Sequence, residues 1–308
     1  MPGFAGRLSI RVRAWWLAPA PASRLAIVRA CVGGAALAQL AYELPSLLAV
    51  LGFLPRQFQP VGVASLLPQP VAAGVLYGCV TACLVLGACF SLGIAYALTA
   101  PGFAFALLVL MTYRSSWGMV LHTDNLLVLH VLLLALAPAA QAWSVDAWRK
   151  ATRGGAPPQP EARLGWPLRA LSVATATCYV LAGVAKLKLA GGAWLGGELL
   201  RAHIAYDNLR KLELGAPIVP LGPWLVRHRA IFPALAVVTL LVELGAPVAL
   251  LGKRWAAAWV GAAWSFHLAV LLTMSIGFTY QLSGVAYLSF FAVDGAVAWA
   301  RGKLGARP

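Results

Sequence analysis

Charged residues are scarce in this sequence. They make up 11% of its 308 residues and only nine are acidic, whereas 61% are hydrophobic and the mean hydropathy is +0.80. Soluble domains carry about 25% charged residues, so the composition excludes that class and indicates an integral membrane protein. The shortage of acidic residues leaves a net charge of +15. Most Lys and Arg lie in short segments between apolar runs, which indicates lipid headgroup contacts rather than nucleic-acid binding.

The sequence also lacks the motifs of common metal and nucleotide sites. There is no H-E-x-x-H, no CxxC pair, no phosphate-binding loop and no dinucleotide fingerprint. The five cysteines all lie inside apolar runs, where they act as small hydrophobic residues rather than a disulfide framework. We therefore predict no metal site and no nucleic-acid partner.

Long apolar runs dominate what is present. A membrane-spanning helix needs about 20 apolar residues, and eight segments qualify: 25–47, 71–90, 94–112, 124–142, 167–187, 231–252, 256–276 and 280–299. The run from Val71 to Thr112 has no charge and would be roughly 63 Å long as one helix, about twice the hydrocarbon core. It must fold back, and we expect the turn at Ser91–Gly93. The run Trp255–Val293 divides by the same logic around "SIGFTY". The expected fold is an all-α, polytopic membrane bundle.

The distribution of Lys and Arg predicts the topology. If the N-terminus is cytoplasmic, 15 of the 24 Lys and Arg lie on the inner side. The positive-inside rule then places both termini in the cytoplasm of a multi-pass protein, which we expect in the bacterial inner (plasma) membrane. Seven of the other nine crowd into residues 186–229. Either a long translocated loop escapes the rule, or these charges serve a site.

The predicted organisation has three parts. Residues 1–24 form a basic interfacial segment containing Trp15 and Trp16, residues 25–300 form a single transmembrane domain, and residues 301–308 form a basic tail. The domain includes a flexible, Pro- and Gly-rich cytoplasmic linker at 143–166 and an outer amphipathic segment at 188–229. Within that segment, leucines at roughly helical intervals predict one amphipathic helix over 194–214. It either roofs a site or simply covers the bundle.

Ionisable side chains are costly at membrane depth, so each is a candidate for a functional site. On the predicted topology, Glu43, His122 and Lys186 lie near the outer ends of three different spans. His267 lies in the outer half of a fourth, and Gln281 opens the last span from the same side. Polar groups from several helices are therefore expected to face one leaflet.

Structural roles are open for several other polar residues. Asp124 directly precedes "NLLVLHVLLLAL" and fits a helix N-cap better than a catalytic acid. His130 and Glu243 can each bridge neighbouring helices by hydrogen bonding. Asp294 lies close to the inner end of its span and is expected at the interface.

Two lysines end one apolar run, in the stretch "YVLAGVAKLKLAGGAWLGGELL" (179–200). Lys186 and Lys188 are about 200° apart around a helix, so they cannot share an environment. Tyr179, Ala182, Gly183 and Lys186 fall on one stripe, which predicts that Lys186 faces the bundle and that Lys188 reaches the headgroups. Desolvation would favour a neutral Lys186 amine, which can act as a base. The alternative is that both lysines extend to the headgroups.

These motifs resemble a known family. "YVLAGVAKLK" followed by Trp and Gly is similar to a stretch of the vitamin K-dependent gamma-glutamyl carboxylase and of its bacterial relatives, the HTTM (horizontally transferred transmembrane) family. "SSWGMVLHTDNLLVLH" and "FHLAVLLTMSIGF" resemble stretches that hold family histidines, and "VELGAPVALL" also looks like the bacterial family. The mammalian carboxylase carries a large lumenal portion for its protein substrate, and the outer segment 188–229 is much smaller. The resemblance spans nearly the whole chain through short motifs, and it does not extend to the lumenal portion that recognises a protein substrate.

The resemblance implies a lysine base, which falls on Lys186, with family histidines at His122 and His267. It also implies a carboxylase-like lyase that uses a reduced quinone similar to vitamin K hydroquinone, entering from the outer leaflet. The expected cofactor-binding residues are Trp117, Tyr179, Glu43 and Gln281. Expected partners are membrane lipids and either a reductase or a substrate protein. The alternative is a non-enzymatic membrane scaffold or partner subunit. Transport is less well supported, because no repeat and no broken midplane span is evident.

Overall fold

The computed structural model describes residues 4–120 and 122–296, and within them the chain is helical with no β-strand. The α-helices are α1 Phe4–Trp16, α2 Ala22–Ala49, α3 Ala73–Leu92, α4 Tyr96–Arg114, α5 Asn125–Ala135, α6 Val145–Thr152, α7 Ala162–Ala190, α8 Glu198–Glu213, α9 Leu221–Val226, α10 Phe232–Leu244, α11 Lys253–Met274 and α12 Thr279–Leu282. The 3-10 helices are Val50–Gly52, Pro55–Gln57, Gly62–Leu66, Gly191–Gly196, Arg229–Ile231, Ala246–Leu251 and Val285–Phe290. The all-α prediction is confirmed.

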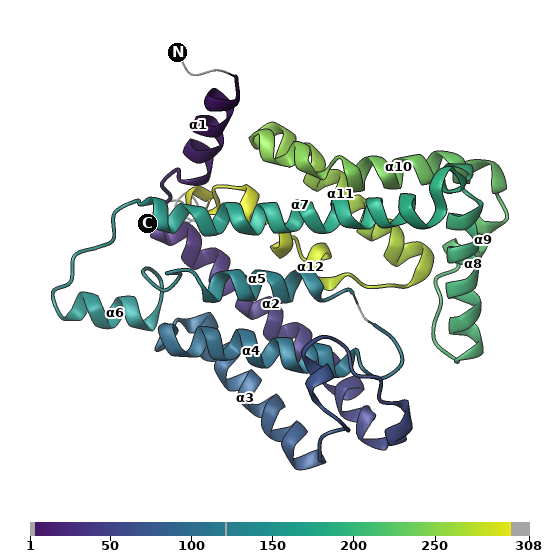
Figure 1. Cartoon of the computed structure of the whole chain (residues 1–308), viewed down its shortest axis with the longest axis horizontal. Coiled ribbons are helices and arrows are strands. Elements are labelled where there is room, and N and C mark those ends of the chain that lie inside the picture. The colour runs from purple at the N-terminus through teal and green to yellow at the C-terminus, as the bar shows by residue number, and fades with distance from the viewer. Residues whose placement is uncertain (1–3, 121, 297–308) are drawn as a thin grey trace, which may run out of the picture. The chain divides into compact units, whose positions relative to one another are not determined.

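The chain divides into two compact units, which are described separately. The first unit contains Met1–Leu171 and Phe291–Pro308, and the second contains Ser172–Phe290, so the boundary falls inside α7. In the first unit α3 packs against α2 and α4, and α5 packs against the same two helices (Figure 1). In the second unit α8, α10 and α11 pack on one another, and α9 packs on α8 and α11.

The turn between α3 and α4 lies where the length of the apolar run predicts it. Gly93 ends α3 with φ +64°, and its N–H donates to the carbonyls of Cys89 and Phe90, which satisfies the last turn of the helix. A side chain at this glycine would collide with Ser144 and with the guanidinium of Arg29. The second expected turn is also present, because α11 ends at Met274, directly before "SIGFTY" (275–280).

Within the described part of the chain, five helices are long and apolar enough to cross a membrane: α3, α4, α11, α2 with its 3-10 extension (Ala22–Gly52), and α7 with its extension (Ala162–Gly196). The multi-pass membrane architecture is thus supported, whereas the count of eight spans is not confirmed. Three expected spans are shorter or interrupted helices. The expected span 124–142 is helical only over α5 before it reaches Pro138. Span 231–252 changes to a 3-10 helix after Gly245. Span 280–299 breaks after α12, where Gly284 has φ +78°.

The segment 143–166, expected to be a flexible linker, contains the helix α6. The Ser144 hydroxyl accepts a hydrogen bond from Ala147 N–H at 2.9 Å and so caps the helix. Asp146 in the first turn and Arg149 and Lys150 in the last turn match the polarity of the helix dipole. A capped, dipole-matched segment forms a helix although the residues that follow it are rich in Pro and Gly. The predicted tail 301–308 lies outside the described residues.

Candidate active site

In the second unit, α7 carries Lys186 to a carboxylate from another helix. Lys186 Nζ forms an ion pair and hydrogen bond with Oε1 of Glu243 on α10. The Glu243 side chain is 4% exposed and that of Lys186 is 24% exposed, whereas Lys188 is exposed. Of the expected stripe, Tyr179 is buried but Ala182 is exposed. The charge that Lys186 brings into the bundle is therefore matched by one acidic group.

A glycine lets α7 and α10 approach closely at this pair. Gly183 lies one turn before Lys186, and a Cβ placed on it would press against the side chains of Glu243 and Leu244. Small residues at helix contacts permit such close packing in membranes. Gly183 thus sets the separation over which the Lys186 amine reaches Glu243.

Aromatic rings surround the Lys186 amine. Its nitrogen lies 5.3 Å from the ring centroid of Trp194 and 5.8 Å from that of Phe266. The indole N–H of Trp194 donates to the Ala236 carbonyl and to the Thr239 hydroxyl, both at 3.3 Å, which fixes the ring. Ring faces attract cations within about 6 Å. The amine is therefore held between a carboxylate and two aromatic side chains.

A chain of hydrogen bonds runs through the same unit from a histidine to two tyrosines. His267 Nε2 lies 2.6 Å from the Tyr179 hydroxyl, which lies 2.6 Å from the Tyr287 hydroxyl. All three side chains are buried. The centroid of the Phe266 ring lies 5.8 Å from the Lys186 amine and 5.2 Å from the centroid of the His267 ring. The lysine pair and the histidine–tyrosine chain thus form one polar cluster in an apolar surrounding.

Four buried polar atoms in the second unit have no hydrogen-bond partner within the described residues. They are Asn208 Oδ1 on α8 and, on the residues considered for the site, Glu243 Oε2, His267 Nδ1 and Gln281 Oε1; each of the four residues is more than nine-tenths buried. Gln281 follows Phe278 by three residues, and the Phe278 ring centroid is 4.5 Å from that of His267. An unsatisfied buried polar atom costs about 1–3 kcal/mol. Such a group of atoms is suited to a ligand that carries hydroxyl or carbonyl oxygens.

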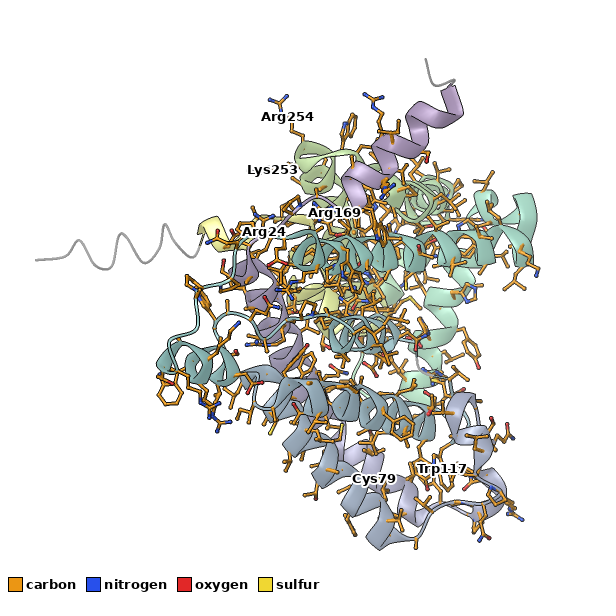
Figure 2. The ribbon with its side chains drawn as sticks, turned by 60° about the vertical axis from the view of Figure 1, so that its left-hand side comes forward. Arg24, Cys79, Trp117, Arg169, Lys253 and Arg254 are labelled. Atoms are coloured by element: carbon orange, nitrogen blue, oxygen red, sulfur yellow. The ribbon has the colours of Figure 1, made fainter. Side chains whose placement is uncertain are left out.

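The remaining candidates from the sequence belong to the first unit. Glu43 is buried on α2 and pairs with Arg114 at 2.5 Å. Trp117 lies in an aromatic group after α4, with ring centroids 5.1 Å from Phe58 and 5.9 Å from Tyr113 (Figure 2). His122 is exposed in the connection before α5. The expectation that these residues share a cavity with Lys186 stays a prediction.

Asp124 has a different role from the helix cap that its position suggests. Its side chain does not cap α5. Its carboxylate instead accepts from Arg114 Nη1 and from Gln39 Nε2, both at 2.9 Å. Gln39 Nε2 also donates to Glu43 at 3.1 Å, so one buried network joins α2, α4 and the start of α5. A buried arginine nearby competes with local capping, and sequence position alone does not reveal that neighbour.

His130 has the bridging role considered for it, and Asp294 forms an ion pair. His130 Nε2 lies 3.3 Å from the Leu171 carbonyl, which links α5 to α7. Asp294 accepts from Arg24 on α2 at 2.6 Å. Figure 2 shows Arg24 together with Arg169 of α7 in the first unit.

Sequence reasoning missed several residues of the second-unit cluster. Glu243 was expected as an ionisable site candidate or as a helix bridge, but its cationic partner was not identified, although a lone carboxylate within an apolar helix predicts one. Trp194 and Phe266 lie in motifs that carry the family resemblance, but neither they nor Tyr287 were predicted to belong to the site. Their proximity to Lys186 and Tyr179 depends on contacts between distant parts of the chain.

The outer segment differs from the single helix expected over 194–214. Gly197, with φ +77°, separates the 3-10 helix Gly191–Gly196 from α8. Asp207 and Asn208 are buried, whereas Leu209 and Leu212 are exposed, so α8 buries polar rather than leucine side chains. Asn208 is buried because its side chain forms a hydrogen bond between helices: it donates to the Thr273 carbonyl on α11 at 2.8 Å.

Apolar helices of membrane-spanning length, with a few paired ionisable groups buried between them, define this chain as a multi-pass integral membrane protein. The family profile of the HTTM domain matches residues 17–294, nearly the whole chain. The protein therefore belongs to the HTTM family, as its motifs indicate. No curated protein and no solved structure matches it significantly.

Proposed function

We propose that this HTTM protein is a carboxylase-like membrane enzyme in which Lys186 removes a proton from the hydroxyl of a lipid-soluble reduced quinone. The observation that carries the proposal is the Lys186–Glu243 pair in the same unit as the partnerless buried atoms Glu243 Oε2, His267 Nδ1 and Gln281 Oε1. Glu243 pairs directly with the amine, and the Phe266 ring lies close both to the amine and to the His267 ring.

The residues present fit such a molecule. The unpartnered atoms offer hydrogen bonds to its oxygens, and the rings of Trp194 and Phe266 offer an apolar, flat-sided surrounding for an aromatic headgroup. A reduced quinone would supply a weakly acidic hydroxyl and the electrons for a reaction with dioxygen. Regeneration of the reduced form would require a reductase partner.

Lys186 and Glu243 can share one proton, and its position decides whether the Lys186 amine can act as a base. When the proton resides on Glu243, the Lys186 amine is neutral and can accept a proton from a hydroxyl within hydrogen-bonding distance. Lys186 then becomes an ammonium beside the new oxyanion, and their opposite charges stabilise one another in a medium with little water. Glu243 is thus a positioning residue that sets the protonation state of the base.

The histidine–tyrosine chain can stabilise the same oxyanion. If Tyr287 donates to Tyr179 and Tyr179 donates to His267 Nε2, the proton of the imidazole lies on Nδ1. Nδ1 is the atom without a partner, so it is available as a hydrogen-bond donor to a bound oxygen. A donor fixed in advance lowers the cost of forming negative charge.

The test is oxygen consumption that depends on added reduced vitamin K, measured with the full-length protein in proteoliposomes. Lys186→Met should abolish the activity, and the matched control Lys188→Met should retain it. If wild-type protein shows no quinol-dependent oxygen uptake, or if Lys186→Met retains it, the lysine-base proposal is refuted.

The second candidate function is a membrane scaffold or partner subunit. It is favoured by one observation: the Lys186 amine is already paired with Glu243, as expected of an ion pair that holds α7 and α10 together. In that case the pair matters for stability alone. Both proposals assume the same location and topology: the bacterial inner membrane, with both termini in the cytoplasm.

A further inference from the structure

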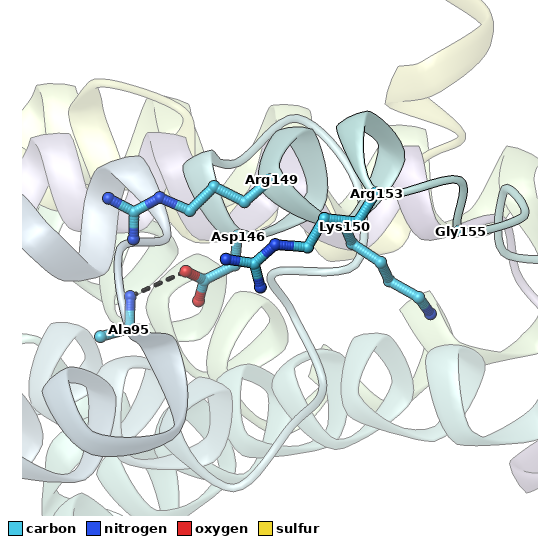
Figure 3. A pocket seen from close by; sticks show the side chains of 6 residues that line it. All are labelled: Ala95, Asp146, Arg149, Lys150, Arg153 and Gly155. Carbon is cyan, nitrogen blue, oxygen red and sulfur yellow. Dashed lines mark hydrogen bonds between the residues drawn. The ribbon is translucent and has the colours of Figure 1, made fainter.

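A basic hollow lies in the first unit, beside the α3–α4 turn and far in sequence from the Lys186 cluster. It has a volume of about 450 Å³ and is lined by Ala95, Asp146, Arg149, Lys150, Arg153 and Gly155 (Figure 3). Three of its six lining residues are cations, and all three come from α6 or the residue that follows it. The hollow thus gathers positive charge from one short stretch of chain.

Asp146, the one carboxylate that lines the hollow, is hydrogen-bonded to the backbone. Asp146 accepts hydrogen bonds from the backbone N–H groups of Ala95 at 2.9 Å and Tyr96 at 2.8 Å, which caps the start of α4 (Figure 3 draws the first). Over residues 4–120 and 122–296, no ion pair involves Arg149, Lys150 or Arg153. These three side chains are exposed. Their charge is therefore available to an anionic ligand.

The position of the hollow on the chain fixes its depth. Ala95 directly precedes α4, one of the helices able to cross the membrane, and it follows the turn that ends α3, which is another. The hollow therefore lies where two spans leave the hydrocarbon, at the level of the lipid headgroups. Trp148, in the middle of α6, is 65% exposed, and indole rings favour this interfacial layer.

We propose that this hollow binds the phosphate headgroup of an anionic phospholipid. Two arginines can contact phosphate oxygens through paired N–H groups, and the lysine adds a point charge. The location at the membrane surface favours a phospholipid over a free phosphate ion, because every membrane presents phosphate groups at this depth. The proposal is independent of the Lys186 chemistry and of which side of the membrane is cytoplasmic.

The experiment measures lipid binding to full-length protein in detergent by native mass spectrometry, with phosphatidylglycerol and phosphatidylcholine titrated separately. The test variant carries Arg149→Gln, Lys150→Gln and Arg153→Gln. The control variant carries Arg56→Gln, Lys188→Gln and Arg227→Gln, which remove the same charge from exposed positions elsewhere. A third variant, with Arg149→Lys and Arg153→Lys, keeps the charge of the hollow.

We expect wild-type protein, the control and the charge-keeping variant to bind phosphatidylglycerol more tightly than phosphatidylcholine. The test variant should bind phosphatidylglycerol at least about tenfold more weakly. Unchanged binding by the test variant, or an equal loss in the control, would overturn the proposal. Complete competition by millimolar inorganic phosphate would also overturn it, since the site would then be one for a free anion.

Discussion

We predict that removing either member of the Lys186–Glu243 pair lowers the free energy of unfolding, and that removing Lys186 lowers it more than removing the Glu243 charge. Lys186→Met leaves Glu243, which is 4% exposed, as a buried carboxylate without a cation. Removing one partner of a buried pair costs about 3–5 kcal/mol, so we expect a loss of about 3 kcal/mol in the free energy of unfolding. Glu243→Gln leaves the Lys186 amine, which is 24% exposed and lies over two aromatic rings. That loss should be smaller, about 1–2 kcal/mol.

The double variant Lys186→Met with Glu243→Gln removes both charges at once. It leaves no uncompensated ion, so its loss should be about 1 kcal/mol, less than that of Lys186→Met alone. The coupling energy of this double-mutant cycle should then be at least about 2 kcal/mol.

The assay is reversible unfolding of the purified protein in mixed micelles of increasing dodecyl sulfate content, followed by far-ultraviolet circular dichroism. Lys188→Met is the matched control and should change stability little, because that amine is exposed. Additive single losses in the double variant, or a larger loss for Glu243→Gln than for Lys186→Met, would show that the pair is not the contact described.

Three further predictions use the same unfolding assay. Arg29 is fully buried and donates to the carbonyls of Ser91, Ala139 and Trp143, so Arg29→Met should cost about 3 kcal/mol or more, while the exposed control Arg13→Met should not. Gly183→Val should separate α7 from α10 and destabilise the protein, and Gly192→Val, at a glycine with open space around it, should be tolerated. Arg229, and less so Arg201, lowers the pKa of Glu198 below its ordinary value of 4.5. Stability from this group is therefore present above pH 4.5 and lost as the pH falls through the lower folded pKa, so the difference between wild type and Glu198→Gln should vanish in acid. A difference that persists there would contradict the assignment.

Hydropathy located membrane helices well where the length of an apolar run alone shows that the run must turn back. The uncharged run Val71–Thr112 is too long for one span, and a glycine able to adopt positive φ marks the turn at Gly93. The expected spans 124–142, 231–252 and 280–299 are not confirmed, because apolar composition measures transfer to lipid rather than the backbone path. Pro138, Gly245 and Gly284 lie at those interruptions and could have signalled them.

Helical periodicity separated the two lysines, since positions two residues apart face different sides of α7. It could not supply Glu243 as the partner of Lys186, because the two are 57 residues apart in sequence. The carboxylate of Asp124 was assigned to a cap for the same reason: its true partner, Arg114, lies on another helix. Partners on different helices therefore require a structure.

The central claim is that the cluster around Lys186 holds a lipid-soluble quinone, and the most direct measurement is the quinone content of protein purified in native lipid. Bound quinone would be extracted and quantified by mass spectrometry for wild type, for Lys188→Met, and for the double variant Lys186→Met with Glu243→Gln, which should remain folded. We predict near-stoichiometric quinone in the first two and a loss of it in the double variant. Absence of quinone from folded wild-type protein, or equal content in all three, would contradict the claim.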